Sequence, residues 1–139
     1  MTRFLHSADW QLGMTRHFLE GEAQARFTAA RIEVIGAIGQ LAVKEGCSFV
    51  VVGGDVFESN QVERQVIVRA LDTMKATSSV KFYLLPGNHD PLDAASVFRS
   101  KTFLDNLKGP NTRSGHRFAD VGSRDGGLRV SGCLAERER

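Results

Sequence analysis

The 139-residue chain has little of what defines several classes of protein. It contains two cysteines, Cys47 and Cys133, in unlike contexts and without metal-type spacing, so neither a disulfide scaffold nor a zinc knuckle is expected. No apolar run approaches the roughly 18 residues of a membrane span, and the N-terminus leaves no room for an apolar signal segment. Charge of one sign is also scarce, because 18 Lys and Arg balance 16 Asp and Glu. These absences predict a cytoplasmic protein with no membrane partner, and they neither require nor exclude DNA.

What the chain does have is the composition of a globular protein, with 42% hydrophobic and 24% charged residues. Its length is that of one domain or part of one. Apolar runs at 4–5, 49–52 and 80–85 predict strands, and helical spacing of apolar residues over 27–42 and 66–74 predicts helices between them. The run at 49–52 is typical of a strand covered on both faces. This alternation predicts an α/β fold with a mainly parallel sheet.

Single residues refine these elements. Gly46 is placed to end the first helix. Gly36 and Gly39 lie inside that helix, where glycine is unfavourable, so we expect close packing against them. Asn60 and Glu63 resemble a capping pair at the start of the second helix.

The remainder of the chain is less regular. Residues 94–98 and 103–107 suggest short helical pieces. Residues 109–127, rich in Gly, Ser, Asn and Arg, are predicted to be loop, and residues 128–130 are predicted to form one more strand.

Polar side chains follow each of the first three predicted strands. They are Asp9 and Gln11 after the first strand, Asp55 after the second, and Asn88, His89 and Asp90 after the third. Because the carboxyl ends of parallel strands lie along one edge of a sheet, we expect these side chains at one site. Taken alone, Asp9 and Asp55 are more often turn or capping carboxylates, and Asn88 is natural in a turn. His89 alone is more often a surface or hydrogen-bonded histidine than a catalyst. Together, oxygen donors with one imidazole suit Mn²⁺, Mg²⁺ or Fe rather than a thiolate-bound zinc.

Three motifs carry a family resemblance. Residues 9–13 (DWQLG), 54–58 (GDVFE) and 87–90 (GNHD) resemble, in this order, the first three motifs of the calcineurin-like metallophosphoesterase superfamily. Within it, residues 5–10 and 53–57 are most similar to the SbcD-type nuclease subunits of DNA double-strand-break repair. The resemblance implies a four-layer α/β/β/α sandwich, of which residues 1–139 would be the N-terminal portion of a single domain.

The resemblance also implies roles for the site residues. Asp9 would bind the first of two divalent ions, most readily Mn²⁺, while Asp55 would bridge both ions and Asn88 would bind the second. Such ions would supply a hydroxide able to attack phosphorus in line. His89 would be the catalytic histidine rather than a ligand, with Asp90 orienting it.

Two features depart from the family pattern. Gln11 stands where the family has histidine, so a neutral amide oxygen replaces an imidazole nitrogen and we expect weaker binding of the first metal. The family takes further histidine ligands from two later motifs. Residues 115–117, around His116, match one of these motifs superficially, and a solvated loop histidine is the alternative interpretation. We therefore expect the chain to be the N-terminal part of a longer phosphoesterase.

Three functions follow from these observations. The resemblance favours metal-dependent hydrolysis of phosphodiester bonds at DNA ends, by a DNA repair exonuclease that works with an SbcC-type ATPase. A second possibility is a phosphoesterase for a small nucleotide. The third, suggested by Gln11 and the missing histidines, is a catalytically inactive fragment that serves as a docking module or forms a homodimer.

Overall fold

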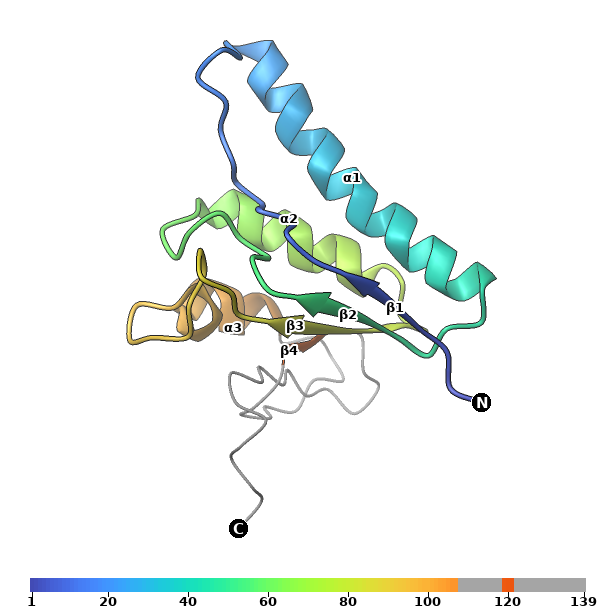
Figure 1. The fold of residues 1–139 in the computed structure, drawn as a ribbon. Helices are drawn as coiled ribbons and strands as arrows, with labels where there is room; N and C mark the ends of the chain where they lie inside the picture. The colour runs from blue at the N-terminus through green and yellow to red at the C-terminus, as the bar shows by residue number, and fades with distance from the viewer. Residues whose placement is uncertain (108–118, 122–139) are drawn as a thin grey trace.

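The computed structural model describes residues 1–107 and the backbone of 119–121. Strands and helices alternate along most of this part of the chain, as the periodicity predicted (Figure 1). The elements are β1 (Phe4–Ser7), α1 (Glu22–Lys44), β2 (Phe49–Gly53), α2 (Arg64–Lys75), β3 (Lys81–Leu85), the 3₁₀ helix η1 (Val97–Arg99), α3 (Lys101–Leu107) and β4 (Ala119–Val121).

The strands form one sheet in the order β1-β2-β3-β4. β1, β2 and β3 are parallel, with Leu5 opposite Val50 and Val50 opposite Phe82, so the predicted mainly parallel α/β sheet is confirmed. β4 pairs antiparallel with β3. It falls inside the stretch predicted to be loop, and that prediction is wrong at 119–121 because pairing with 82–84 makes this segment a strand. The strand predicted at 128–130 lies outside the described residues.

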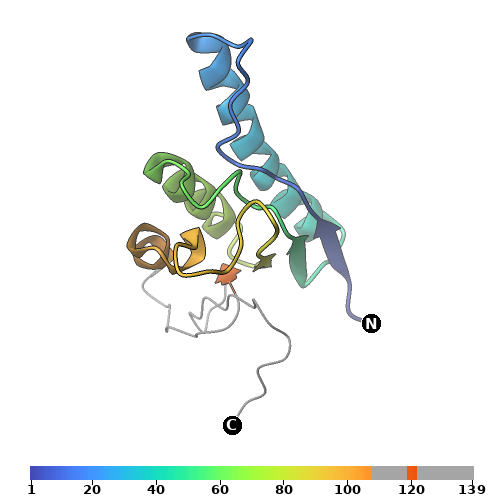
Figure 2. The ribbon, with the colours of Figure 1, turned by 60° about the vertical axis from the view of Figure 1, so that its left-hand side comes forward.

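The helices α1 and α2 cover one face of the sheet (Figures 1 and 2). Val50, Val52 and Phe82 on that face are completely buried. On the opposite face Phe49 and Tyr83 are half-buried and meet edge to face, with ring centroids 5.4 Å apart. In the described residues β2 is therefore covered fully on one face and only partly on the other. These residues make up one helix layer and one sheet layer of the sandwich that the resemblance implies.

Close packing is confirmed at one of the two glycines of α1. A Cβ on Gly39 would lie 2.5 Å from Thr77 Oγ1, just after α2, so glycine is needed there. A Cβ on Gly36 would make an ordinary contact of 3.5 Å with Thr73 Cγ2. Gly46 follows the end of α1 with a φ of 66°, as expected for a residue that stops a helix. None of the helices in residues 1–107 is long and apolar enough to cross a membrane.

The start of α2 differs from the prediction. The residue at the N-cap position is Glu63, and its side chain makes no capping hydrogen bond. Asn60 does not cap the helix. It donates to the carbonyl of Pro91 and accepts a hydrogen bond from the N–H of Val97. The predicted capping pair is therefore wrong, because Asn60 ties its loop to the segment after β3.

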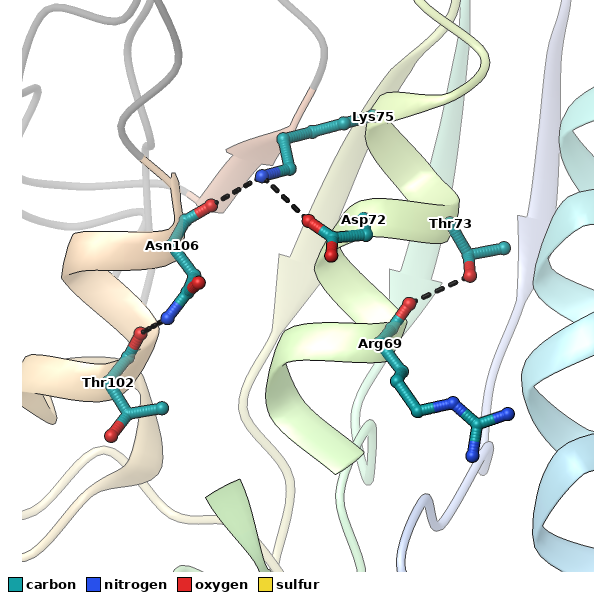
Figure 3. Close-up of polar contacts among 6 residues, drawn as sticks. All are labelled: Arg69, Asp72, Thr73, Lys75, Thr102 and Asn106. Carbon is teal, nitrogen blue, oxygen red and sulfur yellow. Dashed lines mark hydrogen bonds and ion pairs between the residues drawn. The ribbon is translucent and has the colours of Figure 1, made fainter. Parts of the chain in front are cut away.

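Polar contacts hold α3 beside α2 (Figure 3). The Lys75 ammonium donates to the carbonyl of Asn106 near the end of α3 at 2.7 Å and pairs with Asp72 at 3.0 Å. A cation at this place satisfies a free carbonyl and interacts well with the helix dipole. α3 confirms the helical piece predicted at 103–107, while the piece predicted at 94–98 is helical only from Val97, in η1. Phe98 of η1 and Phe103 of α3 pack edge to face with Phe57 beside the site loops.

Candidate functional site

The loops after β1 and β2 lie side by side beyond the ends of their strands. The N–H of Asp9 donates to the carbonyl of Gly54 at 3.1 Å, and the N–H of Gln11 donates to the carbonyl of Asp55 at 2.8 Å. A further parallel bridge joins Leu12 to Phe57. These bonds extend the β1–β2 pairing into the loops and bring the first two predicted parts of the site together.

Three of the predicted site residues have a left-handed backbone. The φ angles of Asp9, Gln11 and Asp55 are 54°, 44° and 51°, and they are the non-glycine residues with positive φ in the described part of the chain. This conformation is unfavourable for residues with a Cβ, although Asp tolerates it better than most. Strained residues tend to cluster at functional sites, so these angles support a special role for this edge of the sheet.

The loop after β3 reaches Asp55 directly. The N–H of His89 donates to Asp55 Oδ1 at 2.9 Å. A Cβ on Gly87 would overlap the Oδ1 and N atoms of Asp55, so only glycine allows the two loops to come this close. Asp55 is 8% exposed as a result, and its carboxylate is held in a fixed position.

Asp90 is completely buried between the same two loops. Its Oδ1 accepts a hydrogen bond from the N–H of Gly87 at 2.7 Å, and its Oδ2 accepts one from the N–H of Phe57 at 2.9 Å. Burial raises the pKa of Asp90 and the nearby charge of Asp55 adds to this effect, while the backbone hydrogen bonds act in the opposite direction. In this geometry the Asp90 carboxyl joins the loops, and an orienting role toward His89 stays a prediction.

The predicted residues differ in their exposure at this edge. Asp9, Asn88 and His89 are exposed and Gln11 is partly buried, whereas Asp55 and Asp90 are buried. All six residues follow the carboxyl ends of β1, β2 and β3, as predicted. His116 lies outside the described residues.

The chemistry of these groups fits a hard divalent cation. Within residues 1–107, no basic side chain forms an ion pair with Asp9, Asp55 or Asp90. Buried carboxylates are normally paired with a cation or bind a metal, and carboxylate and amide oxygens are the donors that Mg²⁺ and Mn²⁺ prefer. No three His, Cys, Asp or Glu side chains of the described residues are grouped to hold a metal by themselves. The amide oxygens of Gln11 and Asn88 would therefore have to complete the ligand set that this part of the chain offers.

A pocket beside Asp9 was not anticipated from the sequence. It has a volume of about 200 Å³ and is lined by Asp9, Trp10, Arg31, Val34 and Ile35. The signal that could have revealed it is Arg31, which stands four residues after Phe27 and four before Ile35, on the apolar stripe of α1. A charged residue on a core-facing stripe indicates either a buried partner or a ligand.

Comparison with known proteins identifies the family of the chain. The SbcD component of the nuclease SbcCD from Rhodobacter capsulatus is 29% identical over 93 residues, which make up 64% of this chain and 22% of that protein. The matched part thus spans less than a quarter of the length of this relative. The profile of the calcineurin-like phosphoesterases matches residues 2–135, nearly the whole chain. The chain therefore belongs to the calcineurin-like phosphoesterase family.

Proposed function

We propose that the chain provides part of the active site of a metal-dependent phosphodiesterase that acts on DNA ends. The observation that carries this proposal is the convergence of Asp9, Asp55, Asn88 and His89 at one sheet edge, where the nearly buried Asp55 has no basic partner in the described residues. The relative from Rhodobacter capsulatus is named as a nuclease and as a component of SbcCD. By analogy, we propose DNA as substrate, an SbcC-type ATPase as partner and the cytoplasm as location.

In this proposal the residues at the carboxyl ends of β1, β2 and β3 have different roles. Asp9, Gln11, Asp55 and Asn88 would hold two divalent ions, with Mn²⁺ the preferred metal. When bound, such ions supply a nucleophile at neutral pH and neutralise charge on the phosphate. His89 is exposed while its backbone is fixed by Asp55, so its imidazole is available to stabilise developing charge or to protonate the leaving alkoxide.

Calorimetric titration of the 139-residue chain with Mn²⁺, followed by an assay on linear DNA, tests this proposal. We expect saturable Mn²⁺ binding that is lost in Asp55→Asn. Mn²⁺-dependent release of nucleotides from DNA ends would extend this result from metal binding to catalysis. Asp72→Asn is the matched control, because Asp72 is an exposed carboxylate on α2 away from the site. Equal Mn²⁺ binding by the unmodified chain and Asp55→Asn would refute the metal site. Turnover of mononucleotides without turnover of DNA would favour the small-nucleotide phosphoesterase.

One observation favours a catalytically inactive module as a second candidate. The described residues offer no group of three His, Cys, Asp or Glu side chains for a metal, and position 11 has an amide. A chain that binds no Mn²⁺ and forms a homodimer in sedimentation experiments would support this candidate over the enzyme.

A further inference from the structure

The pocket beside Asp9 lies between α1 and the connection from β1 to α1. Figures 1 and 2 both show this connection, in dark blue, running up beside α1. Gln24 of α1 fastens it there, since its side chain accepts from the N–H of Arg16 and donates to the carbonyl of Met14. The pocket therefore has a defined wall on each side, and Asp9 places it next to the proposed metal site.

Arg31 brings a positive charge to this pocket. One guanidinium nitrogen donates to the carbonyl of Trp10, and the guanidinium carbon lies 5.4 Å from the centre of the Phe27 ring. No carboxylate of residues 1–107 forms an ion pair with Arg31, whose side chain is only partly buried. Because a guanidinium has five N–H donors in a planar fork that suits phosphate, this arrangement fits a phosphate supplied by a ligand.

The other walls of the pocket are apolar. Trp10 and Ile35 are 8% and 1% exposed, while Val34 is 55% exposed at the rim. A cation beside the accessible apolar side chain of Val34 favours an organic phosphate over an inorganic ion, since Val34 can contact a sugar or a base. The volume of about 200 Å³ is small for a drug-sized ligand but sufficient for one such group.

We propose that this pocket is a substrate subsite that receives the nucleotide next to the cleaved bond, with Arg31 binding its phosphate. Val34, with the small exposed part of Trp10, would contact its sugar or base. The inference rests on the proposed phosphodiesterase function and extends it, because the subsite would select nucleotide chains over simple phosphate esters.

Fluorescence of Trp10 tests the subsite without catalysis. Trp10 is the one tryptophan of the chain and lines the pocket, so its emission reports on the pocket directly. The 139-residue chain, kept in EDTA, is titrated with a 5′-phosphorylated thymidine dinucleotide and, separately, with inorganic phosphate. We expect a saturable change with the dinucleotide and binding at least about tenfold weaker, or about 1.4 kcal/mol less favourable, with inorganic phosphate. No saturable change with the dinucleotide, or equal affinity for both probes, would overturn the proposal.

Variants at the rim locate the binding. Val34→Glu places a negative charge at the pocket, whereas Val43→Glu makes the same change at a valine of α1 that is 47% exposed and does not line it. Neither change disturbs the core, and we expect at least about tenfold weaker dinucleotide binding for Val34→Glu alone. Arg31→Gln should weaken binding similarly, and Arg31→Lys should weaken it less. If Val34→Glu and Arg31→Gln both bind like the unmodified chain, the subsite is refuted.

The two proposals fail in different ways. Dinucleotide binding that depends on Arg31, without Mn²⁺ binding that depends on Asp55, would refute the proposed metal-dependent phosphodiesterase and leave the subsite standing. Normal hydrolysis of DNA with no effect of Val34→Glu or Arg31→Gln on binding would refute the subsite and leave the phosphodiesterase standing.

Discussion

In the loops after β2 and β3, the carboxylates of Asp55 and Asp90 accept three hydrogen bonds from backbone N–H groups. In the loop after β1, the side chains of Asp9 and Gln11 make no hydrogen bond within the described part of the chain, and this loop is joined to its neighbour through the backbone. The first arrangement ties side chains into the fold, and the second leaves them available to a ligand. Substitutions in the two regions should therefore separate loss of stability from loss of binding.

Asp90→Ala should give the largest effect. It leaves the N–H groups of Gly87 and Phe57 buried without acceptors, and each such group costs about 1–3 kcal/mol, so the free energy of unfolding should fall by about 2–6 kcal/mol. Asp90→Asn keeps one acceptor and should lose about half as much. Chemical denaturation followed by circular dichroism measures both values, and a loss below about 1 kcal/mol for Asp90→Ala would show that the loops hold together without this carboxylate.

Gly87→Ala tests the close approach of the same two loops. The added methyl group would overlap Asp55, so we expect the free energy of unfolding to fall by about 1–3 kcal/mol and Mn²⁺ binding to weaken. Gly46→Ala is the control for an exposed glycine, because its Cβ would meet open space and only its φ of 66° opposes the change. Unchanged Mn²⁺ binding in Gly87→Ala would mean that the position of Asp55 does not depend on this contact.

The pH dependence of stability should report on Asp90. Its pKa in the folded chain is raised above the ordinary value of 3.8, mainly by burial, so the folded state holds this proton at pH values where the unfolded state has lost it. The stabilisation is complete below the ordinary pKa and disappears as the pH rises through the folded-state pKa. Urea denaturation of the chain and of Asp90→Asn in EDTA, at a series of pH values, measures it. If the free energy of unfolding of Asp90→Asn changes with pH as steeply as that of the unmodified chain, the pH dependence comes from another group.

Gln11→His should have the smallest effect on folding and a clear effect on metal binding. The Gln11 side chain makes no hydrogen bond in residues 1–107, so the free energy of unfolding should change by less than about 0.5 kcal/mol. An imidazole in place of the amide should strengthen Mn²⁺ binding measured by calorimetry. Loss of stability well above this value would show that Gln11 is part of the fold rather than of the binding surface.

The sequence predicted the parts of the fold that depend on local pattern. β2, α1 and β3 follow from apolar periodicity, and the parallel order of the strands then collects the polar residues at one edge. The prediction failed for Asn60, whose partners are more than 30 residues away in the chain, and for β4, which is a strand because β3 is beside it. Likewise, the sequence placed Asp90 at the site but did not reveal that its oxygens face backbone N–H groups from two loops.

The left-handed backbone at positions 9, 11 and 55 has a consequence for protein engineering. Glycine would adopt these φ angles more easily than Asp or Gln, by about 1 kcal/mol at each position. A library of variants selected only for thermal stability would therefore accumulate glycine at these positions. Each such substitution would remove an oxygen donor. A library selected for turnover would keep the carboxylates. Sequencing the survivors of both selections would map the chemically important positions of this edge without reference to any relative.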